Sequence, residues 1–102
     1  MGTVYVTPFR KSKKVQQDLI GVKTGPTQSI TSSAGASAKH ASALPAGTEY
    51  VQVLASVDGF VEVGVFSSVT AVKPDAIPVK AGIPSHIAVD VDSAGVAAID
   101  LA

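Results

Sequence analysis

Cysteine and tryptophan are absent from this sequence of 102 residues, and aromatic side chains are scarce, with two Tyr and three Phe. Without cysteine the chain has no disulfide framework, no thiolate nucleophile and no cysteine-ligated zinc site. A core with so few aromatic rings depends on Val, Ile, Leu and Ala, and each buried Val or Leu contributes about 1.5 to 3 kcal/mol. We therefore expect a thin core whose burial is completed by contact with other chains.

Charge is also in short supply. Charged residues make up 16% of the chain and the formal net charge is zero, whereas soluble domains average about 25% charged residues. A sparsely charged surface without net charge has little colloidal repulsion, which favours association with itself or with a partner. An ordinary domain with a surface of Ser, Thr and Ala is the alternative interpretation.

Long apolar runs and an export signal are missing as well. No window approaches the roughly 18 apolar residues that a membrane span requires. Basic residues follow the first apolar stretch, which is the reverse of their order in a secretory signal. A chain of this length is enough for one domain and too short for two. We expect a single domain that functions without secretion and without a membrane.

The N-terminal zone, residues 1–26, begins with a short alternating stretch. Val4 and Val6 share one face of this stretch and Tyr5 lies on the other, which is the pattern of a β-strand. A proline and a run of basic residues follow, and they end the strand pattern. We predict a strand and a basic arm or loop over this zone, and a β-sandwich domain over residues 27–102.

A basic cluster dominates the charge pattern of this zone and holds four of the eight basic residues: Arg10, Lys11, Lys13 and Lys14. Residues 15–21 after the cluster fit either a short helix or a mobile or extended loop. We interpret the cluster as a solvated loop or as a docking element for an acidic protein surface. No aromatic side chains are interleaved with it for base stacking, so we expect no nucleic acid partner.

The middle of the chain shows period-two alternation. Residues 27–45 are rich in Ser, Ala and Thr, and the turn residues around them favour two short strands joined at Ala34 and Gly35 over a flexible linker. Clearer alternating runs follow at 50–57 and 60–66. The dipeptide between these runs is Asp-Gly, which tolerates the positive φ angles of a type I′ turn, so we predict a hairpin there.

Further strands are expected in the C-terminal part, where Pro and Gly mark the turns: 69–72, 77–80, 87–91 and 96–101. Seven to nine short strands at this spacing indicate an all-β protein. The predicted fold is a small antiparallel β-sandwich or jelly roll with an N-terminal arm or loop.

Residues that commonly carry catalysis or hold metal ions are few and scattered. His40 and His86 each stand alone among small residues, so neither is expected to act as a base or a ligand. Residues 90–95 place Asp at alternate positions before a Gly, as calcium loops do, but Ala94 replaces the third ligand and no Glu follows. No nucleophile elbow or phosphate-binding glycine loop is present. We expect no enzyme activity, no cofactor and no metal.

Several segments together carry a family resemblance: the opening stretch 4–7, the Ser- and Ala-rich stretch leading to 46–53, the strand 60–64 and the turn 79–82. In this layout the chain resembles the small virion proteins of tailed bacteriophages, of the capsid decoration or cement type. The basic segment 10–14 is not part of that pattern.

The resemblance implies a structural protein that binds the outside of an assembled shell as a homotrimer and clamps neighbouring subunits of the major capsid protein. It would be made in the host cytoplasm and would lie on the capsid surface of the virion. The expected clamp is an N-terminal arm that adds a strand to a partner's sheet, with these candidate partner-binding residues: Val4, Tyr5, Val6, Arg10, Lys11, Lys13 and Lys14. Deleting residues 1–24 would then abolish attachment and leave the β-domain folded.

Other functions stay open alongside this one. The same β-domain would suit a head-to-tail or tail component that forms a ring. It would also suit a small carbohydrate- or ligand-binding sandwich, although sugar sites present exposed aromatic rings and this chain has few to spare.

Overall fold

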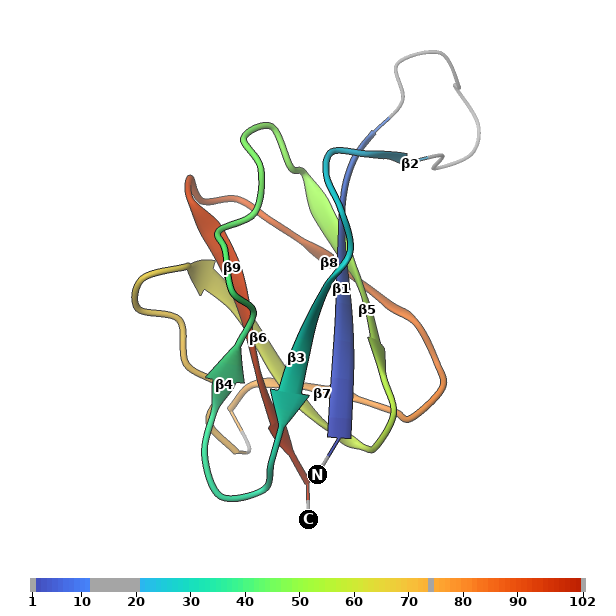
Figure 1. The fold of residues 1–102 in the computed structure, drawn as a ribbon, viewed down its shortest axis with the longest axis vertical. Coiled ribbons are helices and arrows are strands. Elements are labelled where there is room, and N and C mark those ends of the chain that lie inside the picture. The colour runs from blue at the N-terminus through green and yellow to red at the C-terminus, as the bar shows by residue number, and fades with distance from the viewer. Residues whose placement is uncertain (1, 12–20, 74, 102) are drawn as a thin grey trace.

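The computed structural model describes residues 2–11, 21–73 and 75–101, and this part of the chain forms nine β-strands and no helix. The strands make two antiparallel sheets, which form the two layers of a sandwich (Figure 1). The expected all-β sandwich is confirmed, whereas the jelly-roll alternative is not. Within these described ranges no helix is long and apolar enough to cross a membrane. The helix considered for 15–21 falls almost entirely outside them.

One sheet has five strands, in the order β2-β1-β5-β8 with β3 also paired to β1. Its strands are β1 (Gly2–Lys11), β2 (Gly21–Lys23), β3 (Gln28–Ser32), β5 (Tyr50–Ala55) and β8 (Ser85–Ala88). The other sheet has four strands, in the order β4-β9-β6-β7. Its strands are β4 (Ala38–Lys39), β6 (Gly59–Val65), β7 (Ile77–Val79) and β9 (Ala94–Asp100).

The core lies between the two sheets and consists of small aliphatic side chains. Successive residues of a strand point to opposite faces, so most alternating Val positions of the sequence reach this layer, whereas Val65 at the end of β6 is exposed. Its largest fully buried members are Ile30, Val6, Val51, Val53, Val61 and Val96, followed by a proline and a serine. The expectation of a core made of Val, Ile, Leu and Ala is confirmed.

Strand β1 lies inside its sheet and is not a free arm. Over Gly2–Val6 it pairs with β3, and over Val4–Phe9 it pairs with β5. Val4 is 3% exposed and Val6 is fully buried. The expectation of an arm that adds a strand to a partner is therefore wrong for this segment, because its backbone hydrogen bonds and its apolar face are already used within the chain.

The predicted hairpin between the strands 50–57 and 60–66 is also wrong. Both strands exist, but β5 belongs to the five-stranded sheet and β6 to the four-stranded sheet. The residues between them form a corner that passes from one layer to the other, and there the Asp58 carboxylate accepts a hydrogen bond from the Ala81 amide at 2.8 Å. Gly59 does not have the positive φ of a type I′ turn. The alternation of apolar residues predicted both strands correctly, but it could not show which strand each one pairs with.

The segment between β6 and β7 covers the outer face of the four-stranded sheet. Ala71 and Ala76 of this segment form a second buried cluster with Ala97 of β9, and Val69 packs against it. The strand expected at 69–72 is therefore wrong. Ala71 is buried and Val69 partly buried by packing across the sheet and not by pairing with it, whereas Val72 is exposed.

The remaining strands agree more closely with the sequence. Two short strands flank Ala34 and Gly35 as expected, although β3 and β4 belong to different sheets. β7 and β9 match the expected strands at 77–80 and 96–101, and β8 begins and ends slightly earlier than the expected 87–91.

Gly59 is required because β6 approaches β9 closely at this point. A Cβ atom on Gly59 would lie 2.5 Å from the Ile99 carbonyl oxygen, whereas a Cβ atom on Gly35 would meet nothing within 4 Å. We predict that Gly59→Ala lowers the free energy of unfolding by about 1 to 3 kcal/mol. Gly35→Ala, the matched control, should be neutral or add up to about 1 kcal/mol. Urea denaturation of both variants measures the difference, and equal effects would contradict the close approach.

Candidate functional site

The five-stranded sheet has one face in the core and an outer face. Among the described residues, no segment covers this outer face in the way that the segment after β6 covers the other sheet. Cross-strand pairing places alternate residues of four strands on it. We define the outer face by Tyr5, Thr7, Ser29, Thr31, Gln52, Leu54, His86 and Ala88. None of these residues is Asp, Glu, Lys or Arg. These eight residues form an uncharged central surface of hydroxyl, amide and apolar groups. Lys23, which pairs with Phe9, adds positive charge at one end of the same face.

Tyr5 and Leu54 are the large apolar side chains at the centre of the outer face. They are directly paired across β1 and β5, and their side chains are 47% and 36% exposed. Directly opposed side chains on neighbouring strands lie close enough to touch. Together they form an apolar contact point surrounded by uncharged polar residues, which is the composition of a protein-binding patch.

One end of the outer face carries an aromatic group that is already packed within the chain. The ring of Phe9 stacks on Tyr50 with centroids 5.4 Å apart, and His86 meets the edge of Tyr50 at 5.9 Å. Tyr50 is buried by this packing, and the three Phe residues are only partly exposed. All five aromatic residues lie in the described ranges, and Tyr5 is the single exposed one. The described residues therefore form no platform of several exposed rings on which a sugar could stack.

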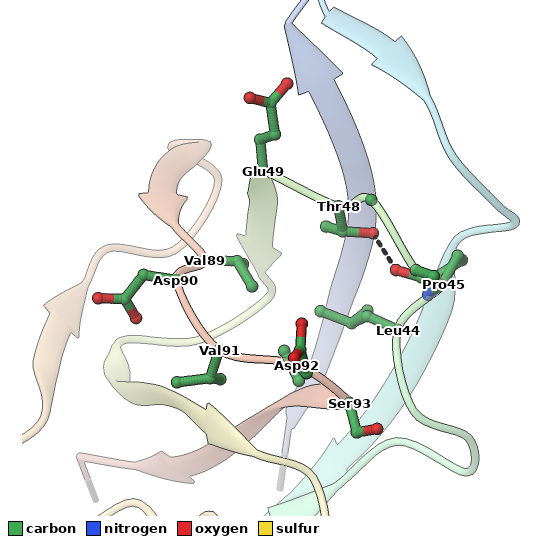
Figure 2. Close-up of a pocket in the computed structure, with 12 residues that line it drawn as sticks. Leu44, Pro45, Thr48, Glu49, Val89, Asp90, Val91, Asp92 and Ser93 are labelled. Atoms are coloured by element: carbon green, nitrogen blue, oxygen red, sulfur yellow. Dashed lines mark hydrogen bonds between the residues drawn. The ribbon is translucent and has the colours of Figure 1, made fainter.

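A cavity of about 390 Å³ opens between two loops at one end of the sandwich (Figure 2). One loop precedes β5 and the other connects β8 to β9. Apolar side chains, Leu44 and Val89 among them, line it together with the acidic residues Glu49, Asp90 and Asp92. Among the described residues no three His, Asp or Glu side chains converge closely enough to hold a metal ion. Residues 90–94 of the segment that resembles a calcium loop form part of the cavity wall.

His40 is buried and uses both ring nitrogens in hydrogen bonds. Its Nε2 accepts from the Val96 amide at 3.0 Å, and Nδ1 lies 2.6 Å from the Ser42 carbonyl oxygen. Because Nε2 accepts, the proton of the neutral ring is on Nδ1, which donates to Ser42. The ring also stacks on Phe66 with centroids 5.3 Å apart. His40 thus joins the loop after β4 to strand β9.

Burial lowers the pKa of His40 below its ordinary value of 6.5, and the positive charge of neighbouring Lys39 lowers it further. The hydrogen bond to the Ser42 carbonyl acts in the opposite direction and favours the protonated ring. Protonation would place a donor at Nε2 against the Val96 amide, which is itself a donor. The geometry therefore holds His40 in its neutral form.

The structure separates the candidate partner-binding residues into different groups. Val4 and Val6 are buried and unavailable to a partner, whereas Tyr5 is exposed. Arg10 and Lys11 are exposed at the end of β1. Lys13 and Lys14 lie outside the described residues.

Most of the outer face was not predicted from the sequence, in which Tyr5 alone among its members was a candidate partner-binding residue. Leu54 and Gln52 occupy the outward positions of an alternating strand, so their direction was readable. Their position beside Tyr5 and Thr7 was not, because it depends on the pairing of β1 with β5.

The fold and this surface define a class: an all-β, two-sheet domain with an uncovered sheet face whose centre is uncharged. The chain matches no protein-family model, and it has no significant match among curated proteins or solved structures.

Proposed function

We propose that the chain is a non-enzymatic structural protein of a tailed-phage virion, which binds the outer surface of the capsid and clamps neighbouring subunits of the major capsid protein. The observation that carries the proposal is the outer face of the five-stranded sheet. Its centre carries no charged side chain, and it presents Tyr5 and Leu54 to solvent. The resemblance in sequence layout to capsid decoration proteins supports the choice of partner.

The size of the outer face suits a contact that is repeated many times. Four strands about 4.8 Å apart and roughly six residues long at about 3.3 Å each span some 20 Å by 20 Å. That is about half of the roughly 800 Å² per partner in a standard interface. A single contact of this size is weak. Many copies on a symmetric shell each stabilise the assembled state by mass action, and contacts that engage together add avidity.

The other functions receive less support from the described residues. A carbohydrate site would need exposed rings, and Tyr5 is the single exposed one. A tail or head-to-tail component would use the same kind of protein-binding face. The two functions differ in the particle that the chain binds, so the experiment below includes both capsid shells and tails.

The test is cosedimentation of the purified chain with empty capsid shells and, separately, with isolated tails of the phage that encodes it. We expect binding to shells and a rise in their disruption temperature. Tyr5→Lys and Leu54→Lys should each weaken shell binding about tenfold or more, because each places an unpaired charge in the centre of the contact.

Ile83→Lys is the matched control, since Ile83 is 59% exposed and is not part of the outer face. It should bind shells as the unchanged chain does. Far-UV circular dichroism confirms that each variant is folded. Unchanged binding by both outer-face variants would remove the assignment of this surface, and binding to tails alone would replace the capsid by the tail.

A further inference from the structure

Both signs of charge gather at one end of the sandwich. The ends of β1 and β2 carry Arg10, Lys11 and Lys23, all exposed. The two loops beside them carry Glu49, Asp90 and Asp92, also exposed, and these line the cavity. Figure 1 shows β2 and both loops at its upper end. A hydrogen bond from the Lys11 amide to a Glu49 carboxylate oxygen, at 2.7 Å, joins the basic and acidic sides of this end.

The cavity itself combines an apolar lining with carboxylates. Leu44 and Val89 point into the space between the loops, and the carboxylate of Asp92 is directed into the same space (Figure 2). None of its lining residues is Lys, Arg or His. A concave, partly apolar site focuses the field of its carboxylates, because screening by water is reduced there. The cavity therefore favours a side chain with a long apolar stem and a cationic head.

We propose that this cavity receives the basic end of β1 from a second copy of the chain, with Arg10 as the inserted side chain. Arginine can lay its aliphatic stem along an apolar wall and keep its charged head at the rim. The planar guanidinium also binds a carboxylate through two parallel hydrogen bonds, as an ammonium group cannot. Asp92 provides the carboxylate in the cavity and Asp90 adds negative charge at its rim.

A second copy is the occupant that the charges specify. The acidic cavity and the basic strand end are different patches on one chain, so each copy can both give and receive an arginine. Two copies can exchange arginines reciprocally as a two-fold pair, or each copy can bind the next one in a ring. With no net charge on the chain, overall repulsion between copies does not oppose the approach. The inference does not depend on the proposed capsid function, because it concerns the free protein.

Sedimentation velocity of the full chain at about 50 mM and about 500 mM NaCl tests the proposal. At low salt we expect assemblies of two or more copies of the 10.3 kDa chain. At high salt the monomer fraction should rise, because the Debye length falls from over 10 Å to about 4 Å. Asp92→Lys and Arg10→Glu should each raise the dissociation constant about tenfold or more, a loss equivalent to about 1.4 kcal/mol.

The decisive variant combines Asp92→Lys with Arg10→Glu in one chain, because the swapped charges then face each other again in the assembly. Association should recover to within a few-fold of the unchanged chain. Asp75→Lys is the matched control, as Asp75 is exposed outside the cavity and away from its loops, and it should associate normally. A monomer at low salt, or a double variant that associates no better than the single ones, would overturn the proposal. Shells are absent from this experiment, so failure here leaves the capsid proposal untouched.

Discussion

Val6→Asp should unfold the domain. Val6 is fully buried in the middle of β1, between Gln28 of β3 and Val53 of β5. A carboxylate there has no partner and loses its hydration, and the expected cost is about 4 kcal/mol or more. A domain of this size has only about 5 to 15 kcal/mol of stability in total. Urea denaturation followed by far-UV circular dichroism measures the loss.

The adjacent position provides the control for this prediction. Tyr5→Asp makes the same kind of change one residue earlier, but Tyr5 points to solvent, so stability should change by less than about 1 kcal/mol. Removal of residues 1–11 should likewise abolish folding, because it takes away the strand that joins β3 to β5. A folded and stable truncated protein would restore the arm that the sequence suggested.

Acidification should destabilise the protein through His40. The unfolded chain binds a proton at this residue near pH 6.5, whereas burial delays protonation of the folded chain to lower pH. Between these two pH values the unfolded state holds more protons, so the free energy of unfolding falls as pH falls. The full stability is present above pH 6.5, and the slope below it is at most about 1.4 kcal/mol per pH unit.

Thermal unfolding between pH 8 and pH 5, compared with that of His40→Gln, isolates the contribution of this ring. The variant should lose about 1 to 3 kcal/mol at neutral pH, because the ring that stacks on Phe66 and holds the acceptor for the Val96 amide in place is lost. Its pH dependence over this window should be weaker. His86→Ala removes the other histidine, which is exposed on the outer face, and should retain the slope of the unchanged chain. An identical slope in His40→Gln would contradict the assignment.

Strand positions were readable from the sequence because alternation is a local property. The alternating run 50–57 puts Val51, Val53 and Ala55 on one face, and all three are buried. The pairing of strands was not readable, since period-two alternation is the same whichever strand lies alongside. The segment of Asp58 and Gly59 illustrates this limit. The same dipeptide fits a tight hairpin, and in this fold it turns a corner between sheets where the close approach to Ile99 requires glycine.

The candidate surfaces depend on contacts between distant parts of the chain. The outer face needs β1 to lie between β3 and β5, and residues 2–6 alone do not show that they occupy the centre of a sheet. The cavity joins the loop 44–49 to the loop 89–94. The acidic and apolar residues of the two loops have no shared pattern in the sequence. In the sequence, Asp90 and Asp92 therefore matched only an incomplete calcium-loop pattern.

The absence of cysteine allows a direct test of the central claim that the outer face binds the capsid. Leu54→Cys places a single thiol on the outer face, and Ile83→Cys places one on an exposed loop outside it. The alkylation rate of each thiol is measured with the protein free and bound to empty shells. We predict that binding slows alkylation at position 54 about tenfold or more and leaves position 83 unchanged. Equal alkylation rates at position 54 in the free and shell-bound protein would contradict the account.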